Sequence, residues 1–219
     1  MAYLVKQTPQ KSPRKKASAR GPITFDQFYE MVDDGVKADL LDGQIIRDLP
    51  AAPKHGQEAS WACTLIKNYS DALDLGETFV APATVRLSQY QGPEPDVFFI
   101  RKDRLSIVNE KFVEGPPDLC VEVISKSSRQ RDRGRKFVLY ADHGVQEYWL
   151  IDSLRDTLEF YENVEGEWRE IKPDEQGRLH SKVLPGFWLK PAWLAAKPLP
   201  SVLKILREIL GEKFDAIGK

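Results

Sequence analysis

The sequence predicts a mixed α/β fold, in which helices flank a central mixed β-sheet. DLCVEVI, at residues 118–124, is almost wholly apolar, as expected of a strand buried on both faces. A helical pattern follows at 127–144, and the strand VQEYWLID follows at once at 145–152. Strand, helix and strand in so short a space predict a βαβ unit. We also expect a hairpin region after residue 150.

The remaining elements are predicted from caps, turns and periodicity. Residues 24–35 predict a short helix with Thr24 as cap, and 55–75 predict a longer one that ends at Gly76. Asp42–Gly43 between two apolar runs, and Glu165–Gly166 between 157–163 and 167–171, predict hairpins. Further strands are expected at TFVAP, TVRLSQY, PDVFFI and near 178–189. The end, PSVLKILREILGEKF, predicts an amphipathic helix that packs on the body or on a second subunit.

Length and composition bound the class of protein. The 219 residues suit one domain with appendages, and 42% hydrophobic with 30% charged residues is ordinary for a globular chain. No apolar run reaches the roughly 18 residues that a membrane helix needs, and the start lacks the features of a secretory signal. The two cysteines, Cys63 and Cys120, show no close pairing, which favours a reducing, cytoplasmic setting. The three histidines lack zinc-ligand spacing.

The charge is unevenly distributed, and this suggests how the chain is divided. Residues 1–20 carry six Lys and Arg residues and no acid, which leaves 26 basic and 33 acidic residues beyond position 20. We therefore expect a basic disordered arm at 1–20, a single domain at 21–195 and a C-terminal amphipathic helix at 196–219. The arm either adds nonspecific attraction to phosphates or is a solvated tail without a role.

Two carboxylates stand out among the predicted strands. Glu122 is the lone ionisable group in the middle of an apolar run, where an unpaired charge costs several kcal/mol. Asp96 follows Pro95 and opens the apolar strand VFFI. If these strands are neighbours, the two side chains converge and offer the oxygen ligands that Mg²⁺ prefers. Alternatively, Glu122 is neutralised by an arginine, and Asp96 only accepts hydrogen bonds from backbone amides at a strand start.

A basic cluster follows the Glu122 strand. Five positive charges lie within eight residues, interrupted only by Asp132: Arg129, Arg131, Arg133, Arg135 and Lys136. Lys136 shares a helical face with Arg133 and Tyr140. A lysine there would hold a scissile phosphate or an attacking water, and Tyr140 would add a hydrogen bond.

Roles without a function in catalysis or binding are also open for these residues. The basic cluster is then a solvated helix face, rather than Arg129, Arg131 and Arg133 contacting a nucleic-acid backbone. Tyr140 is then a core aromatic side chain. His55, at the expected opening of a helix, is then a cap or a surface residue.

The stretches PEPDVFFI and GPPDLCVEVISKSSRQRDRGRKFVLYADHGVQEYWLID resemble the Uma-type family of predicted endonucleases. That family belongs to the restriction-endonuclease-like PD-(D/E)-x-K superfamily. The resemblance runs from about Phe25 to Trp193, and 115–152 is its most specific part. It implies a restriction-endonuclease-like core and a magnesium-dependent nuclease site. Pro95–Asp96 matches the PD element and Glu122 the second acid, and the backbone carbonyl of Val123 is then a further metal ligand.

The chain departs from that superfamily pattern at two positions. Ile124 stands where the superfamily has its lysine, two residues after the second acid, and Lys136 resembles a lysine moved to the following helix. Asp39 stands where the family usually has glutamate. The resemblance makes Asp39 an auxiliary acid near the metal, with His55 and Tyr140 as further auxiliary candidates.

Two functions of different classes follow. The first is a divalent-metal-dependent endonuclease that acts on nucleic acid, with DNA preferred, and uses Mg²⁺ or, as a substitute, Mn²⁺. The second is a binding or assembly module that kept the fold and lost turnover. A homodimer is expected by analogy with double-strand cutters, and the C-terminal helix offers an apolar stripe for it.

Overall fold

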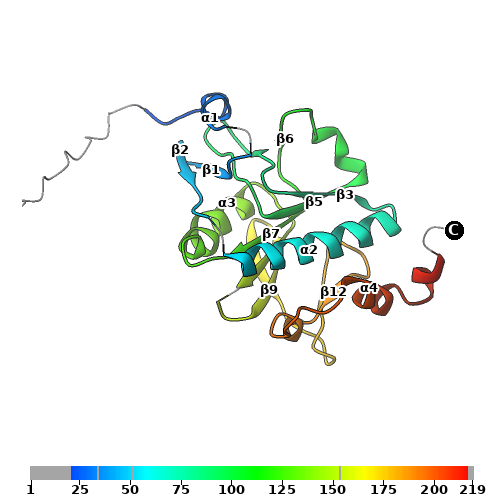
Figure 1. Ribbon diagram of the computed structural model, residues 1–219. Coiled ribbons are helices and arrows are strands. Elements are labelled where there is room, and N and C mark those ends of the chain that lie inside the picture. The colour runs from blue at the N-terminus through cyan, green and yellow to red at the C-terminus, as the bar shows by residue number, and fades with distance from the viewer. Residues whose placement is uncertain (1–20, 34, 51, 153, 217–219) are drawn as a thin grey trace, which may run out of the picture.

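The computed structural model describes residues 21–216 apart from 34, 51 and 153, so the expected arm at 1–20 lies outside the described residues. Its centre is a six-stranded sheet with the strand order β10-β9-β8-β7-β5-β3 (Figure 1). The strands are β3 Gly76–Val80, β5 Val97–Arg101, β7 Leu119–Ile124, β8 Glu147–Asp152, β9 Thr157–Val164 and β10 Glu167–Ile171. Strands β7 and β8 pair in parallel and the other neighbours pair antiparallel. The predicted mixed α/β fold is confirmed.

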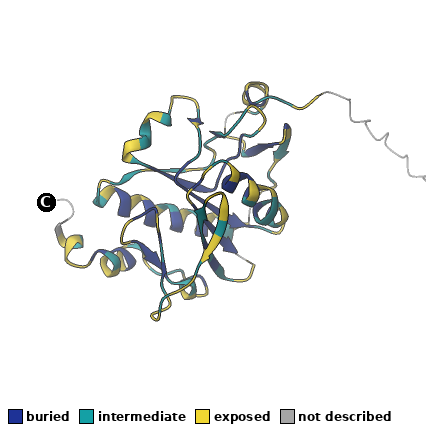
Figure 2. Ribbon diagram, turned by 180° about the vertical axis from the view of Figure 1, so that it is seen from behind, coloured by how far each residue is buried: buried dark blue, intermediate teal, exposed yellow. Residues whose placement is uncertain are grey.

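Helices cover both faces of this sheet. Helices α2 (Pro53–Ala72) and α4 (Val202–Leu210) pack on one face, and α3 (Lys136–Asp142) packs on the other. In β7, Val121 and Val123 face α2, whereas Cys120 faces α3. This alternation explains why every residue of the strand except Glu122 is apolar. Figure 2 shows the sheet and the inner side of α2 as buried between exposed helix surfaces.

The predicted βαβ unit is present, with two local features of its own. Ser125 and Ser128 close the turn after β7 by exchanging backbone N–H to side-chain Oγ hydrogen bonds of 3.0 and 3.1 Å. The cap expected at Ser127 or Ser128 was wrong: Ser125 Oγ accepts from the backbone N–H of Ser128, and the Ser125 carbonyl accepts from that of Arg129, so Ser125 is the capping residue. A π-helical turn, η2 (Arg131–Arg135), then leads into α3.

Both predicted hairpins form with left-handed turn residues. Strands β1 (Ala38–Leu41) and β2 (Gln44–Arg47) meet at Asp42 and Gly43, whose φ angles are 51° and 69°. Positive φ at both positions is what a two-residue hairpin of this kind requires. The second hairpin turns at Glu165 and Gly166, but it is no separate extension, because β9 and β10 form the outer strands of the central sheet.

The helices at the two ends of the chain anchor to the body. Thr24 caps α1 (Phe25–Met31), as predicted. Ile205, Leu206 and Leu210 of α4 are buried in the same cluster as Trp61 of α2. The C-terminal helix thus packs on the body, which decides between the two placements that the sequence left open.

The remaining elements are short. Two further two-stranded pairs are β4 (Val85–Arg86) with β6 (Val113–Glu114), and β11 (Leu179–His180) with β12 (Trp188–Leu189). Helical turns occur at η1 (Lys102–Ile107), η3 (Pro191–Trp193) and η4 (Gly211–Ala216). Among the described residues, no helix combines the length and apolar character needed to cross a bilayer.

Gly76 offers a test of how tightly β3 is docked. Its φ is 151°, and a Cβ there would lie 2.1 Å from the carbonyl oxygen of Ile100. Gly144 also has a positive φ, 83°, but a Cβ there would meet nothing within 4 Å. We expect Gly76→Ala to lower the free energy of unfolding by about 2 kcal/mol more than Gly144→Ala, because only the first change adds a clash. Denaturant titration measures both losses, and equal losses would contradict the packing described.

Candidate active site

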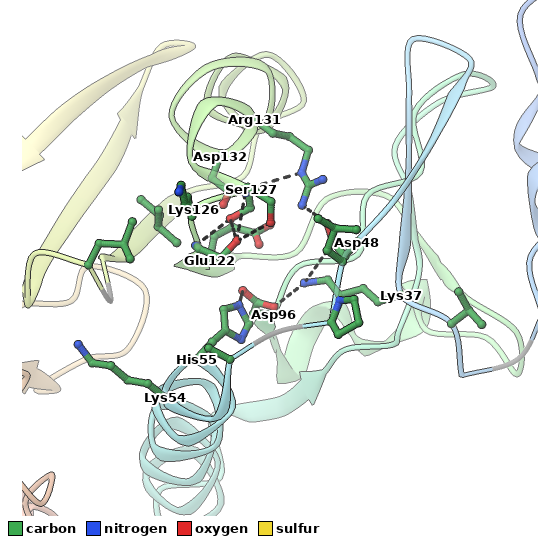
Figure 3. Close-up of a pocket in the computed structure, with 18 residues that line it drawn as sticks. Lys37, Asp48, Lys54, His55, Asp96, Glu122, Lys126, Ser127, Arg131 and Asp132 are labelled. Carbon is green, nitrogen blue, oxygen red and sulfur yellow. Dashed lines mark hydrogen bonds and ion pairs between the residues drawn. The ribbon is translucent and has the colours of Figure 1, made fainter. Parts of the chain in front are cut away.

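Strand register brings the two predicted carboxylates together. Strand β5 pairs with β7 so that Val97 lies opposite Val121, which places Asp96, just before β5, opposite Glu122. Both side chains line one cavity of about 740 Å³. Figure 3 shows them converging from neighbouring elements, below the turn that carries Arg131 and Asp132.

Glu122 is held through one of its two oxygens. The residue is 2% exposed, and its Oε1 accepts hydrogen bonds from Lys136 Nζ and from the Tyr140 hydroxyl, each at 2.8 Å. Its Oε2 accepts none from the residues that the structure describes. Burial raises the pKa of Glu122 to about 7, against the opposing effect of the Lys136 charge. The carboxylate is therefore oriented by Oε1, with Oε2 left to the cavity.

Asp96 has partners on both oxygens. Its Oδ2 accepts a hydrogen bond of 2.7 Å from the backbone N–H of Val123 and lies 3.4 Å from His55 Nε2. Its Oδ1 is ion-paired with Lys37. Burial opposes the charge of Asp96, but Lys37 and His55 together hold its pKa below the ordinary value. The backbone amide contact expected of a strand-start aspartate is thus present in addition to the pairing with Glu122.

Lys136 and Asp39 lie behind Glu122, outside the set of residues that line the cavity. Lys136 is fully buried, with Nζ 2.8 Å from Glu122 Oε1 and 3.0 Å from Asp39 Oδ1. Although burial opposes its charge, the carboxylates of Asp39, Glu122 and Asp132 keep the pKa of Lys136 well above its ordinary value. Asp39 is anchored in turn by the backbone N–H of Glu94, at 2.8 Å. The structure therefore joins Asp39, Lys136, Tyr140 and Glu122 into one polar unit.

Most side chains of the basic cluster at 129–136 form ion pairs with other residues of the chain. Arg131 pairs with Asp48, and its Nε lies 3.1 Å from Asp39 Oδ2. Arg133 makes two contacts with Glu159, of 2.7 and 2.8 Å. These pairs tie the turn before α3 to the β1–β2 hairpin and to β9. Arg129 is the member of the predicted trio that makes no side-chain ion pair with any described residue.

Asp132 is a site residue that the sequence reading did not single out. It lies in the π-helical turn, is 1% exposed and lines the same cavity. Its Oδ1 is buried without a hydrogen bond in the described part of the chain, and the nearest cation is Arg131 Nε at 3.7 Å. Burial raises its pKa. In the sequence, only its spacing of four residues from Lys136, which places the two side chains on one helical face, pointed to a role at the site.

Cations form the rim of the cavity. The sequence reading also missed Lys37, Asp48 and Lys54, which come from the chain before β1, the chain after β2 and the first turn of α2. Figure 3 shows Lys37, Lys54 and Arg131 around the buried carboxylates, and the exposed Lys126 lines the same space. The cavity thus has an acidic floor and a basic rim.

His55 lies in the first turn of α2, because that helix begins at Pro53 with Ala52 as its N-cap. The expectation that His55 caps the helix or lies on the surface was wrong: its side chain is 17% exposed and faces Asp96. The hydrogen bond to Asp96 raises the pKa of His55 above 6.5.

This contact predicts a pH-dependent contribution to stability in the presence of chelator. A histidine whose pKa is raised on folding contributes stability that is full below its unfolded value, near 6.5, and is lost as pH rises through the folded value. We expect the difference in unfolding free energy between wild type and His55→Gln to be largest at acidic pH and to shrink above neutrality. Denaturant titrations from pH 5.5 to 9 measure it. A difference independent of pH would show that the imidazolium does not pair with Asp96.

Comparisons with known proteins agree with this fold. The Uma2 family model, described as "Putative restriction endonuclease", matches residues 25–192. An uncharacterized protein of Synechocystis sp., slr1290, is 31% identical over 175 residues, covering 78% of this chain and 89% of that protein. A crystal structure from Anabaena variabilis, described as a "putative nuclease belonging to DUF820", has a TM-score of 0.66 at 20% identity and covers 79% of this chain and 97% of its own.

The class that these findings define is the restriction-endonuclease-like nucleases. The chain belongs to the Uma2 family, and the resemblance inferred from PEPDVFFI and the 115–152 stretch is confirmed. At 20% identity, the Anabaena structure supports the fold alone.

Proposed function

We propose that the protein is a divalent-metal-dependent endonuclease that hydrolyses phosphodiester bonds, with DNA as its substrate. The observation that carries this proposal is the pair of carboxylates, Asp96 and Glu122, on the floor of a cavity with a cationic rim. An acidic floor suits a metal cation, and a basic rim suits the phosphates of a nucleic-acid backbone. Membership of the Uma2 family supports the same class of activity.

The donor set fits Mg²⁺, with Mn²⁺ as a substitute. Among the described residues, no group of three or more His, Cys, Asp or Glu side chains is placed to hold a metal ion. Mg²⁺ does not need such a cage, because it usually takes one or two carboxylates and completes its shell with water and substrate phosphate. Glu122 Oε2 and the buried Asp132 Oδ1 both lack hydrogen-bond donors in the described structure. We propose Asp96, Glu122 and the backbone carbonyl of Val123 as the ligands.

The chain supplies orientation and charge for the hydrolysis. A bound divalent cation would lower the pKa of a water and neutralise charge that develops on the phosphate. Lys136 and Tyr140 fix Glu122 through Oε1, and the Val123 amide fixes Asp96 through Oδ2. In the reaction, water adds to phosphorus and one P–O ester bond breaks, which leaves a phosphate monoester and a hydroxyl group.

Burial modifies the role proposed for Lys136. Because Lys136 is fully buried and does not line the cavity, we propose that it acts through Glu122 as a positioning residue rather than by touching the phosphate. Backbone phosphates would instead meet Lys54 and Lys126 on the rim, with Arg129 nearby in sequence. Arg131 and Arg133 would contribute by holding the turn in place.

A cleavage assay tests the proposal. Purified protein is incubated with supercoiled DNA, linear DNA, single-stranded DNA or RNA, in Mg²⁺, Mn²⁺ or chelator. We expect metal-dependent cutting of DNA that falls at least about a hundredfold in Asp96→Asn and Glu122→Gln, because each removes a ligand charge worth several kcal/mol. Glu147→Gln is the matched control: this buried carboxylate of β8 bonds Trp149 and Ser181 away from the cavity.

The outcomes separate the two functions. Full activity in either site variant, with circular dichroism showing a folded chain, would refute the assignment. Cutting of RNA alone would overturn the choice of DNA. Absence of cutting by the wild type on every substrate would favour the binding or assembly module instead.

The proposal extends to a homodimer in a cytoplasmic setting. The apolar stripe expected to form the dimer is buried on the body of the same chain, so a dimer needs another surface. Light scattering at working concentration should give twice the mass of the chain, and a monomer would remove this part of the proposal. Cys63 and Cys120 are free thiols, in keeping with a reducing compartment.

A further inference from the structure

Both carboxylate oxygens of Asp96 already contact other groups of the protein, so a metal ion would have to displace one of them. Oδ2 is tied to the Val123 amide at 2.7 Å and faces His55 at 3.4 Å. The other oxygen, Oδ1, is the one that Lys37 contacts. Any cation that binds Asp96 through Oδ1 must therefore take the place of the Lys37 ammonium.

The Lys37 ammonium can move away from Asp96 and still keep an acidic partner, Asp48. Its Nζ lies 3.7 Å from Asp48 Oδ2, on the chain that follows β2. Its side chain is 22% exposed and lines the cavity, whereas Lys136, the other lysine at this cluster, is fully buried. Lys37 also lies just before β1, outside the central sheet, and Figure 3 shows its side chain reaching toward Asp96.

We propose that Lys37 is a displaceable counter-ion, which neutralises Asp96 in the metal-free protein and yields Oδ1 to the divalent cation by moving toward Asp48. This inference rests on the metal site of the proposed function and adds a step that the site itself does not require. The ammonium stays in the cavity after the exchange, where it faces the space that a substrate phosphate would fill. Lys37 would thus limit metal affinity before substrate binds.

The electrostatic consequence is specific to Lys37. Removing it abolishes a competitor for Oδ1 and a positive charge beside the metal, so metal binding becomes tighter. The metal-free protein loses stability at the same time, since a buried carboxylate is left without its partner. A lysine with only a structural role would change the second property and not strengthen metal binding.

Calorimetric titration with Mn²⁺, in the absence of nucleic acid, measures the effect. We expect Lys37→Met to bind Mn²⁺ at least tenfold more tightly than the wild type, and Lys37→Arg to stay within about threefold of it. Asp96→Asn should lose binding. The matched control is Lys54→Met, because Lys54 lines the same cavity but pairs with Asp156 at 2.6 Å, and its affinity should change by less than threefold.

Thermal unfolding supplies a second readout on the same proteins. In chelator, the midpoint of Lys37→Met should lie below that of the wild type, and the rise on adding saturating Mn²⁺ should be larger for the variant. Lys37→Gln serves the same purpose if Lys37→Met does not fold.

The possible failures are distinguishable. Unchanged or weaker Mn²⁺ binding by the Lys37 variants, with binding still lost in Asp96→Asn, overturns the counter-ion and leaves the proposed metal site intact. If neither the wild type nor Asp96→Asn binds Mn²⁺, the proposed metal site and the proposed counter-ion are both overturned.

Discussion

The ion pair between Glu122 and Lys136 is the contact on which the site depends. Both groups are withdrawn from water, Glu122 in the middle of β7 and Lys136 at the start of α3. Removing one partner of such a pair typically costs about 3–5 kcal/mol, because the other is left buried and charged. The pair therefore fixes the position of α3 over β7, and with it the position of everything that the connecting turn carries.

That turn is ion-paired with the β1–β2 hairpin region and with β9. Arg131 reaches the β1–β2 hairpin through Asp39 and Asp48, while Arg133 reaches β9 through Glu159. The hairpin brings Lys37 beside Asp96, and α2 brings His55 to the other side of the same carboxylate. Arg131 and Arg133 belong to a run of basic residues that resembles a solvated helix face, but in the structure they form ion pairs with other segments of the chain. Lys37, Lys54 and Lys126 line the cavity and add positive charge there, although Lys37 and Lys54 are themselves ion-paired with Asp96 and Asp156.

The parts of this arrangement that local pattern determines were predictable. Period-two alternation placed Glu122 on one face of a buried strand, and the short βαβ spacing placed the Lys136 helix directly after it. Lys37, Asp48 and Lys54 were not predictable, because each enters the cavity through long-range packing of segments that carry no motif. Asp132 was hidden for a local reason: a π-helical turn changes the angular spacing on which a helical pattern is judged. The membership of β9 and β10 in the central sheet likewise depends on pairing between β8 and β9, which no single strand sequence reports.

The central claim is that Asp96 and Glu122 together bind a divalent cation. A crystal of the wild-type protein soaked in Mn²⁺, with anomalous diffraction measured, tests it most directly. We predict an anomalous peak bound by Asp96 Oδ1 and Glu122 Oε2, with the Lys37 ammonium moved off Asp96. A Lys37–Asp96 contact that persists at saturating Mn²⁺, with no peak between the two carboxylates, would contradict the claim.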